Sequence, residues 1–199
     1  MVCFSSKGAG DLYIQVECMN LLETYALKDA LYYDSQTTDK SRYTVENGSA
    51  TISYGSNGAT ITGRTNTVSF VKNTALTLPS EYIATFTITA CGGDTGSKGT
   101  EYGGVVFDDW FTDWRSTDTS DTYKLSNTSK LSSNLSKIQA NDVIKIVRES
   151  SSMKLYVNDV LQSTDNNINH TGYFKHRTYK NGSSSGRSLT VKNLMIKPL

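Results

Sequence analysis

The sequence predicts an all-β fold, a jelly-roll sandwich of two antiparallel sheets. Apolar residues recur at every second position in many short segments, which places them on one face of an extended strand. Turn-forming residues or short polar breaks separate these segments, and none shows the spacing of an amphipathic helix. The chain is also rich in Ser and Thr and has 12 Tyr but only 2 Pro. Such a composition suits strands whose outer faces carry Thr, Ser and Tyr.

The most regular segment predicts an antiparallel meander. Ile144 and Ile146 share one face of an extended run, and a polar break follows at residues 150–152. A second alternating run, 153–157, then leads to Asn158-Asp159. Asn and Asp tolerate positive φ, so this pair predicts a second tight turn.

Turn signals also mark the rest of the chain. Asn47-Gly48 predicts a type I′ hairpin turn, and Asn57-Gly58 a second hairpin. Further strands are expected at 11–18, 43–45, 50–54, 59–62, 68–71, 82–89, 103–107, 122–125, 173–174 and 189–196. Long loops are expected at 91–101, 108–121 and 180–187.

The length of 199 residues suits one large β domain. We assign the sandwich to residues 29–199, and residues 1–28 to an N-terminal strand. That strand is either an added edge strand or the end of a preceding similar repeat, because residues 10–19 and 186–195 share a pattern.

Charge and targeting signals exclude several classes of function. The net charge of +1 gives no field that would favour nucleic acid. No apolar run is long enough to cross a bilayer, so we expect no membrane insertion. The N-terminus lacks the features of a signal peptide. Cys3, Cys18 and Cys91 form neither a disulfide framework nor a metal-binding spacing.

Ordered features of the chain resemble the concanavalin A-like lectin/glucanase superfamily in its LamG-like form. The features that carry the resemblance are Ala30–Asp34, Tyr43–Ile52, Asp142–Glu149, Leu155–Asp159 and Leu189–Ile196. The resemblance implies a concanavalin A-like jelly roll, and such domains occur in bacteriophage structural proteins, adhesins and carbohydrate-binding modules. It therefore implies a glycan or cell-surface receptor as partner, other subunits of a larger assembly, and a virion or extracellular location.

The same resemblance implies an option for structural calcium. Asp29, Asp34 and Asp39 begin the matched region, where related domains can hold an ion near the closing strand. The closing strand offers Asn193 where an Asp would be a firmer ligand. We therefore expect no cofactor.

One segment combines aromatic and charged residues in the way that a sugar-binding site does. Aromatic rings pack on the C–H face of a sugar, while carboxylates and guanidinium groups bond its hydroxyls. The candidate residues are Tyr102, Asp108, Asp109, Trp110, Asp113, Trp114 and Arg115. Trp110 and Trp114 would share a face of an extended segment. The alternative is that one Trp fills the core and the other caps a sheet edge.

A second candidate surface lies near the C-terminus. Lys175, Arg177 and Tyr179 alternate and could line one sheet face. The alternative is a solvated strand of mixed charge. We expect His170 and His176 to be solvated histidines in a loop-like region.

Catalysis is not expected. Retaining glycoside hydrolysis needs two carboxyl groups about 5 Å apart, and no alternating acidic run supplies them. Asp108 and Asp109 are adjacent, so on a strand they would point to opposite faces. The sequence thus favours a binding domain over an enzyme. A structural or oligomerisation module is the alternative, and a glycoside hydrolase ranks third.

Overall fold

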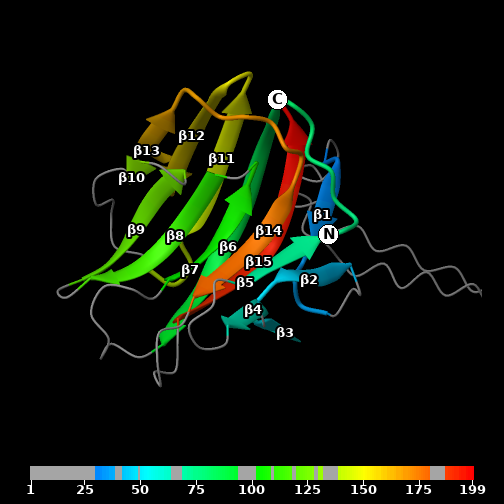
Figure 1. Cartoon of the computed structure of the whole chain (residues 1–199), viewed down its shortest axis with the longest axis vertical. Helices are drawn as coiled ribbons and strands as arrows, with labels where there is room; N and C mark the ends of the chain where they lie inside the picture. Colours follow the sequence, from blue (N-terminus) through cyan, green and yellow to red (C-terminus); the bar gives the residue numbers. More distant parts are fainter. Residues whose placement is uncertain are drawn as a thin grey trace, which may run out of the picture.

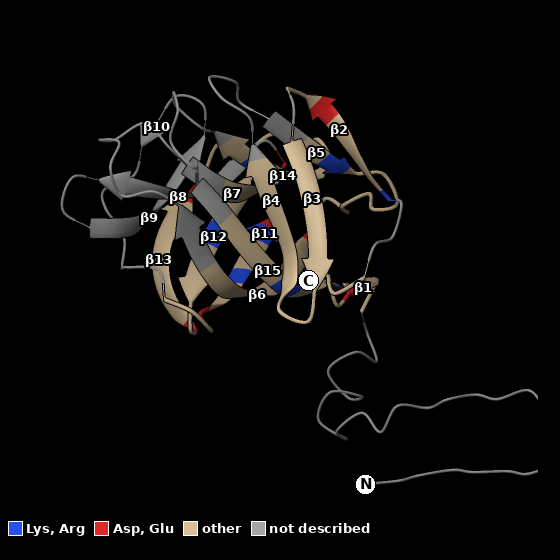
Figure 2. Cartoon of the chain, turned by 90° about the horizontal axis from the view of Figure 1, so that it is seen from below, with Lys and Arg blue, Asp and Glu red and all other residues tan. Residues whose placement is uncertain are grey.

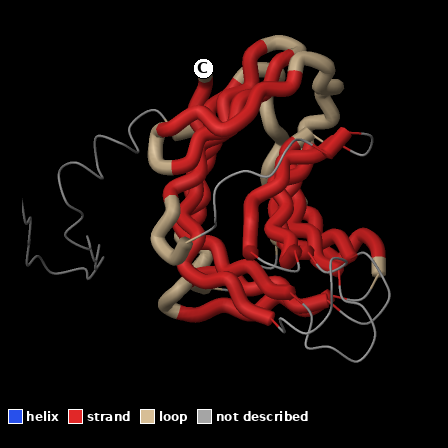
Figure 3. Tube along the Cα trace, turned by 90° about the vertical axis from the view of Figure 1, so that its left-hand side faces the viewer, coloured by secondary structure: helices blue, strands red, loops and turns tan. Residues whose placement is uncertain are grey.

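A computed structural model gives the fold of the chain as two layers of antiparallel strands (Figures 1 and 3). The structure describes residues 30–38, 42–48, 50–63, 69–93, 102–108, 110–117, 120–127, 130–131, 139–179 and 187–199. The assignment of residues 1–28 lies outside this part of the chain. So do Cys3 and Cys18.

The first layer is an eight-stranded sheet with the path β13-β12-β11-β6-β15-β4-β3, and β1 also pairs with β15. Its strands are β1 (Tyr32–Asp34), β3 (Ala50–Gly55), β4 (Gly58–Gly63), β6 (Tyr82–Gly93), β11 (Val143–Glu149), β12 (Ser152–Val157), β13 (Val160–Asp165) and β15 (Arg187–Pro198).

The second layer is a seven-stranded sheet in the order β10-β9-β8-β7-β14-β5-β2. Its strands are β2 (Tyr43–Asn47), β5 (Ser69–Asn73), β7 (Tyr102–Phe107), β8 (Trp110–Thr117), β9 (Ser120–Asn127), β10 (Lys130–Leu131) and β14 (Phe174–Tyr179). The prediction of a two-sheet antiparallel sandwich is therefore confirmed.

Alternating burial builds the core between the sheets, as the sequence predicted. In β11, Ile144 and Ile146 are buried, and Lys145 between them is more exposed. The turn at Asn158-Asp159 has positive φ at both residues, 50° and 64°. The predicted meander of β11, β12 and β13 is therefore confirmed.

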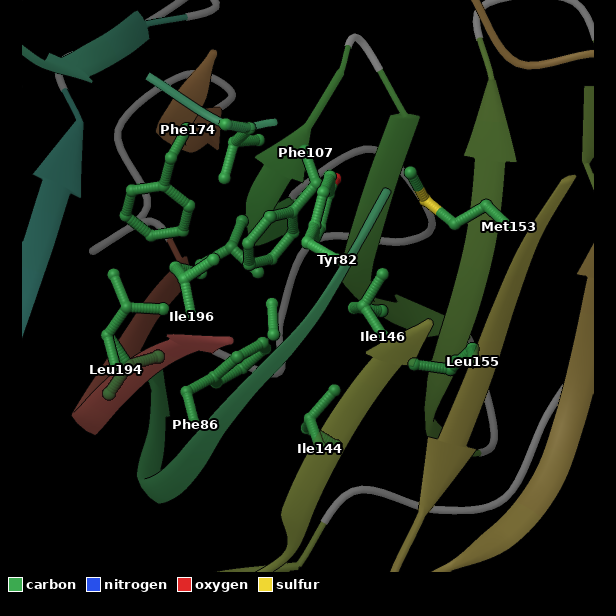
Figure 4. Packing of buried hydrophobic residues seen from close by; sticks show 14 of the residues in the cluster. Tyr82, Phe86, Phe107, Ile144, Ile146, Met153, Leu155, Phe174, Leu194 and Ile196 are labelled. Carbon is green, nitrogen blue, oxygen red and sulfur yellow. The ribbon is translucent and has the colours of Figure 1, made fainter. Parts of the chain in front are cut away.

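Aromatic rings join the two layers at the centre of the core (Figure 4). The ring of Phe107 from β7 lies 5.0 Å from that of Phe174 in the same sheet. It also lies 6.2 Å from the rings of Tyr82 and Phe86, which β6 contributes from the other sheet. All four residues are at most 2% exposed. Edge and offset contacts of this kind stabilise the packing beyond simple burial.

Two local predictions are wrong. Residues 108–121 were expected to be a loop, but β8 spans most of this segment and pairs with β7 and β9 on either side. Asn47-Gly48 was expected to close a hairpin. Gly48 has φ of 73°, yet β2 lies in one sheet and β3 in the other. The chain therefore turns there to cross between layers.

A buried carboxylate connects the layers beside the aromatic rings. Asp108 directly follows β7, and its side chain is fully buried. Its Oδ1 accepts hydrogen bonds from the backbone N–H groups of Thr171 (2.9 Å) and Gly172 (2.7 Å). Its Oδ2 accepts one from the Tyr82 hydroxyl at 3.0 Å. Burial, together with this carboxylate, raises the pKa of Tyr82 well above its usual value.

Arg148 of β11 supplies the opposite charge. Its Nε lies 3.5 Å from Asp108 Oδ2, and its side chain is 2% exposed. Its guanidinium also donates to the backbone carbonyl of Ile168 at 3.0 Å. A buried carboxylate is tolerated only when it is paired and hydrogen-bonded. We name the contacts of Asp108 with Tyr82, Arg148 and the 168–172 segment the Asp108 network.

Asp108→Asn should lower the free energy of unfolding by about 3–5 kcal/mol, because Arg148 would keep its charge in the core without a counter-ion. Urea unfolding followed by circular dichroism measures this. The matched control is Asp159→Asn, since Asp159 also pairs with a cation, Lys145, but is 84% exposed. That control should change stability by less than about 1 kcal/mol. Equal effects of the two substitutions would show that the network does not stabilise the fold.

Candidate functional site

The two faces of the seven-stranded sheet differ in chemistry. In β14, Phe174, His176 and Thr178 are buried toward the other sheet. Lys175 and Arg177 alternate with them, so they lie on the face directed away from the core. We name this surface the outer face.

Strand register places residues from both segments singled out from the sequence on the outer face. Residues opposite each other in an antiparallel ladder share one face. Tyr102 of β7 is paired with Tyr179 of β14 on one side and with Arg115 of β8 on the other. Gly104 is paired in the same way with Arg177 and Asp113. Two adjacent rows of the outer face therefore contain five of the candidate residues.

The remaining candidates are placed differently. Trp110 and Trp114 are paired with Phe107 and Gly103. Their positions in β8 therefore alternate with those of Asp113 and Arg115. The side chains of Tyr102, Tyr179 and all β8 residues lie outside the described part of the structure, as does Asp109. A binding role for these residues stays a prediction. Asp108 is buried, and its contacts in the Asp108 network give this carboxylate a structural role.

The described part of the outer face contains a cluster around Tyr173, which is 40% exposed. The Lys72 ammonium lies 3.5 Å from the centre of its ring, and the Lys175 ammonium lies 5.1 Å from it. Lys72 and Lys175 are directly opposite each other in the β5–β14 ladder. A cation over an aromatic face is stabilised by the ring quadrupole. The ring therefore holds two ammonium groups close together.

Glu46 of β2 completes this cluster. Its Oε2 lies 2.6 Å from Lys175 Nζ. The β2–β5 register shifts between Val45 and Asn47, so Glu46 lies in a bulge. Bulges redirect side chains and are common beside functional sites. Figure 2 shows the acidic segment of β2 and the basic segment of its neighbour β5.

The sequence analysis identified Lys175 but missed Lys72, Tyr173 and Glu46. The pairing of β5 with β14 brings together residues about a hundred positions apart. No local sequence pattern predicts this pairing. The alternation of Lys175, Arg177 and Tyr179 was a correct signal, because their register positions share one face.

One histidine lies where the sequence analysis did not expect it. His176 was expected to be solvated but is 1% exposed. Its ring lies 5.5 Å from the ring of Tyr43 and 5.2 Å from that of Phe174. Burial lowers the pKa of His176 to about 3. His170 is 39% exposed, as expected, with Nδ1 at 3.1 Å from Asp108 Oδ1.

The calcium option rested on three aspartates, of which Asp29 and Asp39 lie outside the described residues. Asp34 is buried, and its carboxylate contacts Arg42 at 3.1 Å, the Tyr32 hydroxyl at 3.2 Å and the Gln36 backbone N–H at 2.9 Å. Among the described residues, no group of three or more His, Cys, Asp or Glu could hold a metal ion. Within that same part of the chain, no helix is long and apolar enough to span a membrane.

Comparison with known proteins gives matches at the level of structure. No family model matches the sequence, and no curated protein matches it. A Bacillus subtilis protein of unknown function with a galectin-like fold has a TM-score of 0.62 and 8% identity, covering 85% of this chain and 96% of its own.

Two further matches carry functional descriptions. The carbohydrate-binding module CBM66 from Bacillus subtilis has a TM-score of 0.54 and 16% identity, over 78% of this chain and 95% of that one. The apo Crh5 transglycosylase has a TM-score of 0.57 and 12% identity, over 84% and 83%. The chain has the concanavalin A-like fold. The predicted resemblance is thus confirmed as a likeness of fold.

The buried histidine makes stability depend on pH. The folded pKa of about 3 lies below the ordinary value of 6.5, so protons favour the unfolded chain. The contribution is fully present above pH 6.5 and is lost as the pH falls toward 3. The loss should be about 1.4 kcal/mol per pH unit in that window. Urea unfolding at a series of pH values measures the slope.

His176→Phe should reduce this slope, because a phenyl ring can pack against Tyr43 and Phe174 but does not titrate. The control is His170→Gln, which should keep the slope because it leaves His176 in place. An unchanged slope in His176→Phe would show that other groups cause the acid sensitivity.

Proposed function

We propose that this chain is a non-catalytic module that binds a carbohydrate through the outer face. The observation that carries the proposal is the strand register, which brings two separate segments of the sequence onto one surface. Tyr102 and Tyr179 are at neighbouring positions there. Arg115 is in the same row, and Arg177 is in the adjacent row. Tyrosines offer packing surface for sugar C–H groups, and guanidinium groups bond hydroxyls and carboxylates.

The fold supports this proposal. CBM66, a carbohydrate-binding module, has a similar structure over nearly its whole length. Because one fold hosts many functions, the argument for binding depends on the residues of the outer face. Their combination of aromatic and charged positions fits a saccharide better than it fits a purely apolar ligand.

The described acidic residues of this surface support binding without catalysis. Among the side chains that the structure describes there, Glu46 is the single carboxylate, and it pairs with Lys175. Hydrolysis by the two-carboxylate mechanism requires a second one about 5–10 Å away. The similarity to the Crh5 transglycosylase makes an assay for transglycosylation the direct test of this point.

The module would belong to a larger assembly, as a viral tail or capsid protein or a cell-surface protein. Its partners there would be a glycan or a glycosylated receptor and the other subunits. This context is supported by the resemblance described from the sequence, in which such domains are common.

A glycan array probed with the purified chain tests the function. We expect binding that Tyr179→Ala and Tyr102→Ala weaken by about tenfold or more, since each substitution removes an aromatic surface on which the sugar C–H groups pack. The matched control is Tyr156→Ala, because Tyr156 lies on β12 in the other sheet and is partly exposed. It should bind as the unmodified chain does.

Trp110→Ala and Trp114→Ala belong in the same experiment. Loss of binding in a folded variant would extend the site to β8, whereas loss of stability would place these residues in the core. Failure of the unmodified chain to bind any glycan would refute the proposed function.

The alternative function, a structural module, has one observation in its favour. β13 is the edge of the eight-stranded sheet, and it exposes Val160 by 61% and Leu161 by 52%. Exposed apolar edge strands can pair with another chain. Light scattering of the chain and of Leu161→Lys decides this alternative, since an oligomer formed through β13 would dissociate in the variant.

A further inference from the structure

The outer face places like charges opposite each other. Lys72 and Lys175 form a direct cross-strand pair, and such a pair of like charges destabilises a sheet. Both ammonium groups lie over the ring of Tyr173. The ring therefore offsets part of the repulsion and fixes where the two charges lie.

The charge of the cluster is only partly balanced. Glu46 pairs with Lys175 at 2.6 Å, and the side chain of Lys175 is only 13% exposed. In the part of the chain that the structure describes, no carboxylate forms a salt bridge with Lys72. Arg177 adds a further positive charge on the same face, two residues beyond Lys175 in β14. Lys72 and Lys175 thus face one described carboxylate, that of Glu46.

We propose that the outer face selects an anionic saccharide, whose carboxylate or sulfate lies against Lys72 and Lys175 while its ring packs beside the tyrosines. This inference rests on the proposed function and names the ligand class of the same site. An anion placed there would relieve the repulsion between the two lysines. It would also form charge-assisted hydrogen bonds, which are stronger than neutral ones.

A saccharide fits better than a simple polyanion because aromatic positions accompany the charges. The ring of Tyr173 lies close to both lysines. The register puts Tyr102 and Tyr179 two rows away from Lys175 on the same face. With a net charge of only +1, the chain has no long-range field to hold a polyanion by charge alone. The positive charge is confined to the cluster around Tyr173, so we expect selectivity only for ligands that contact this cluster.

Isothermal titration calorimetry with matched probes tests this inference. The probes are oligogalacturonate and its methyl ester, dextran sulfate and unmodified dextran of equal length, and polyglutamate. We expect the oligogalacturonate or the dextran sulfate to bind at least about tenfold more tightly than its neutral counterpart. Which of the two binds more tightly identifies the anionic group. The affinity should fall as salt rises from about 50 mM to about 500 mM, because salt screens exposed charges.

Three variants locate the site. Lys72→Gln should weaken binding of the anionic probe by about tenfold, and Lys72→Arg should retain it. The matched control is Lys197→Gln, since Lys197 lies on β15 in the other sheet. It should bind as the unmodified chain does. Thermal denaturation checks that each variant is folded.

The outcomes separate this inference from the proposed function. Equal binding of neutral and anionic saccharides, or equal effects of Lys72→Gln and Lys197→Gln, would overturn the inference and leave carbohydrate binding in place. Binding of polyglutamate as tight as that of the anionic saccharides would also overturn it, because charge alone would then suffice. If no saccharide binds, both proposals fail together.

Discussion

The structure depends on one buried ion pair, that of Asp108 and Arg148. It joins the end of β7 in one sheet to β11 in the other, and it fixes the segment that leads into β14. A second contact acts in the same place, since the Asp108 backbone N–H donates to the Tyr173 carbonyl at 3.1 Å. Buried charges cost desolvation energy, so their main contribution here is to specify one arrangement of strands.

That arrangement determines the outer face. With the start of β14 held against the end of β7, Phe174 pairs with Phe107 and the rest of the register follows. A shift of one residue would move Lys175 and Arg177 into the core and Phe174 and His176 out of it. The positions of the binding candidates on the outer face therefore depend on the buried Asp108–Arg148 ion pair, which is not itself part of the proposed binding surface.

The sequence predicted the parts of the fold that depend on local alternation and missed those that depend on pairing. Ile144 and Ile146 announce β11 because the period of two is visible within a few residues. β8 is different, because the 108–121 segment that contains it is rich in Asp, Ser and Thr, which are typical of a loop. It is a strand because β7 and β9 flank it. His176 was misjudged because its region was taken to be a loop, although its alternation with Phe174 was the better signal. For the candidate site, alternation predicted that Lys175 and Arg177 share a face, whereas Lys72 could be found only from the register.

Net charge was a poor guide to the chemistry of this surface. A total of +1 correctly argues against a broad electrostatic field, but it averages over the whole chain. Charges separated by more than about 8–10 Å are screened from one another at physiological salt, so a ligand senses mainly its nearest groups. Around Tyr173 those groups are Lys72 and Lys175, with Glu46 paired to only one of them. A nearly neutral protein can therefore present a locally cationic surface, provided that strand pairing rather than sequence proximity assembles it.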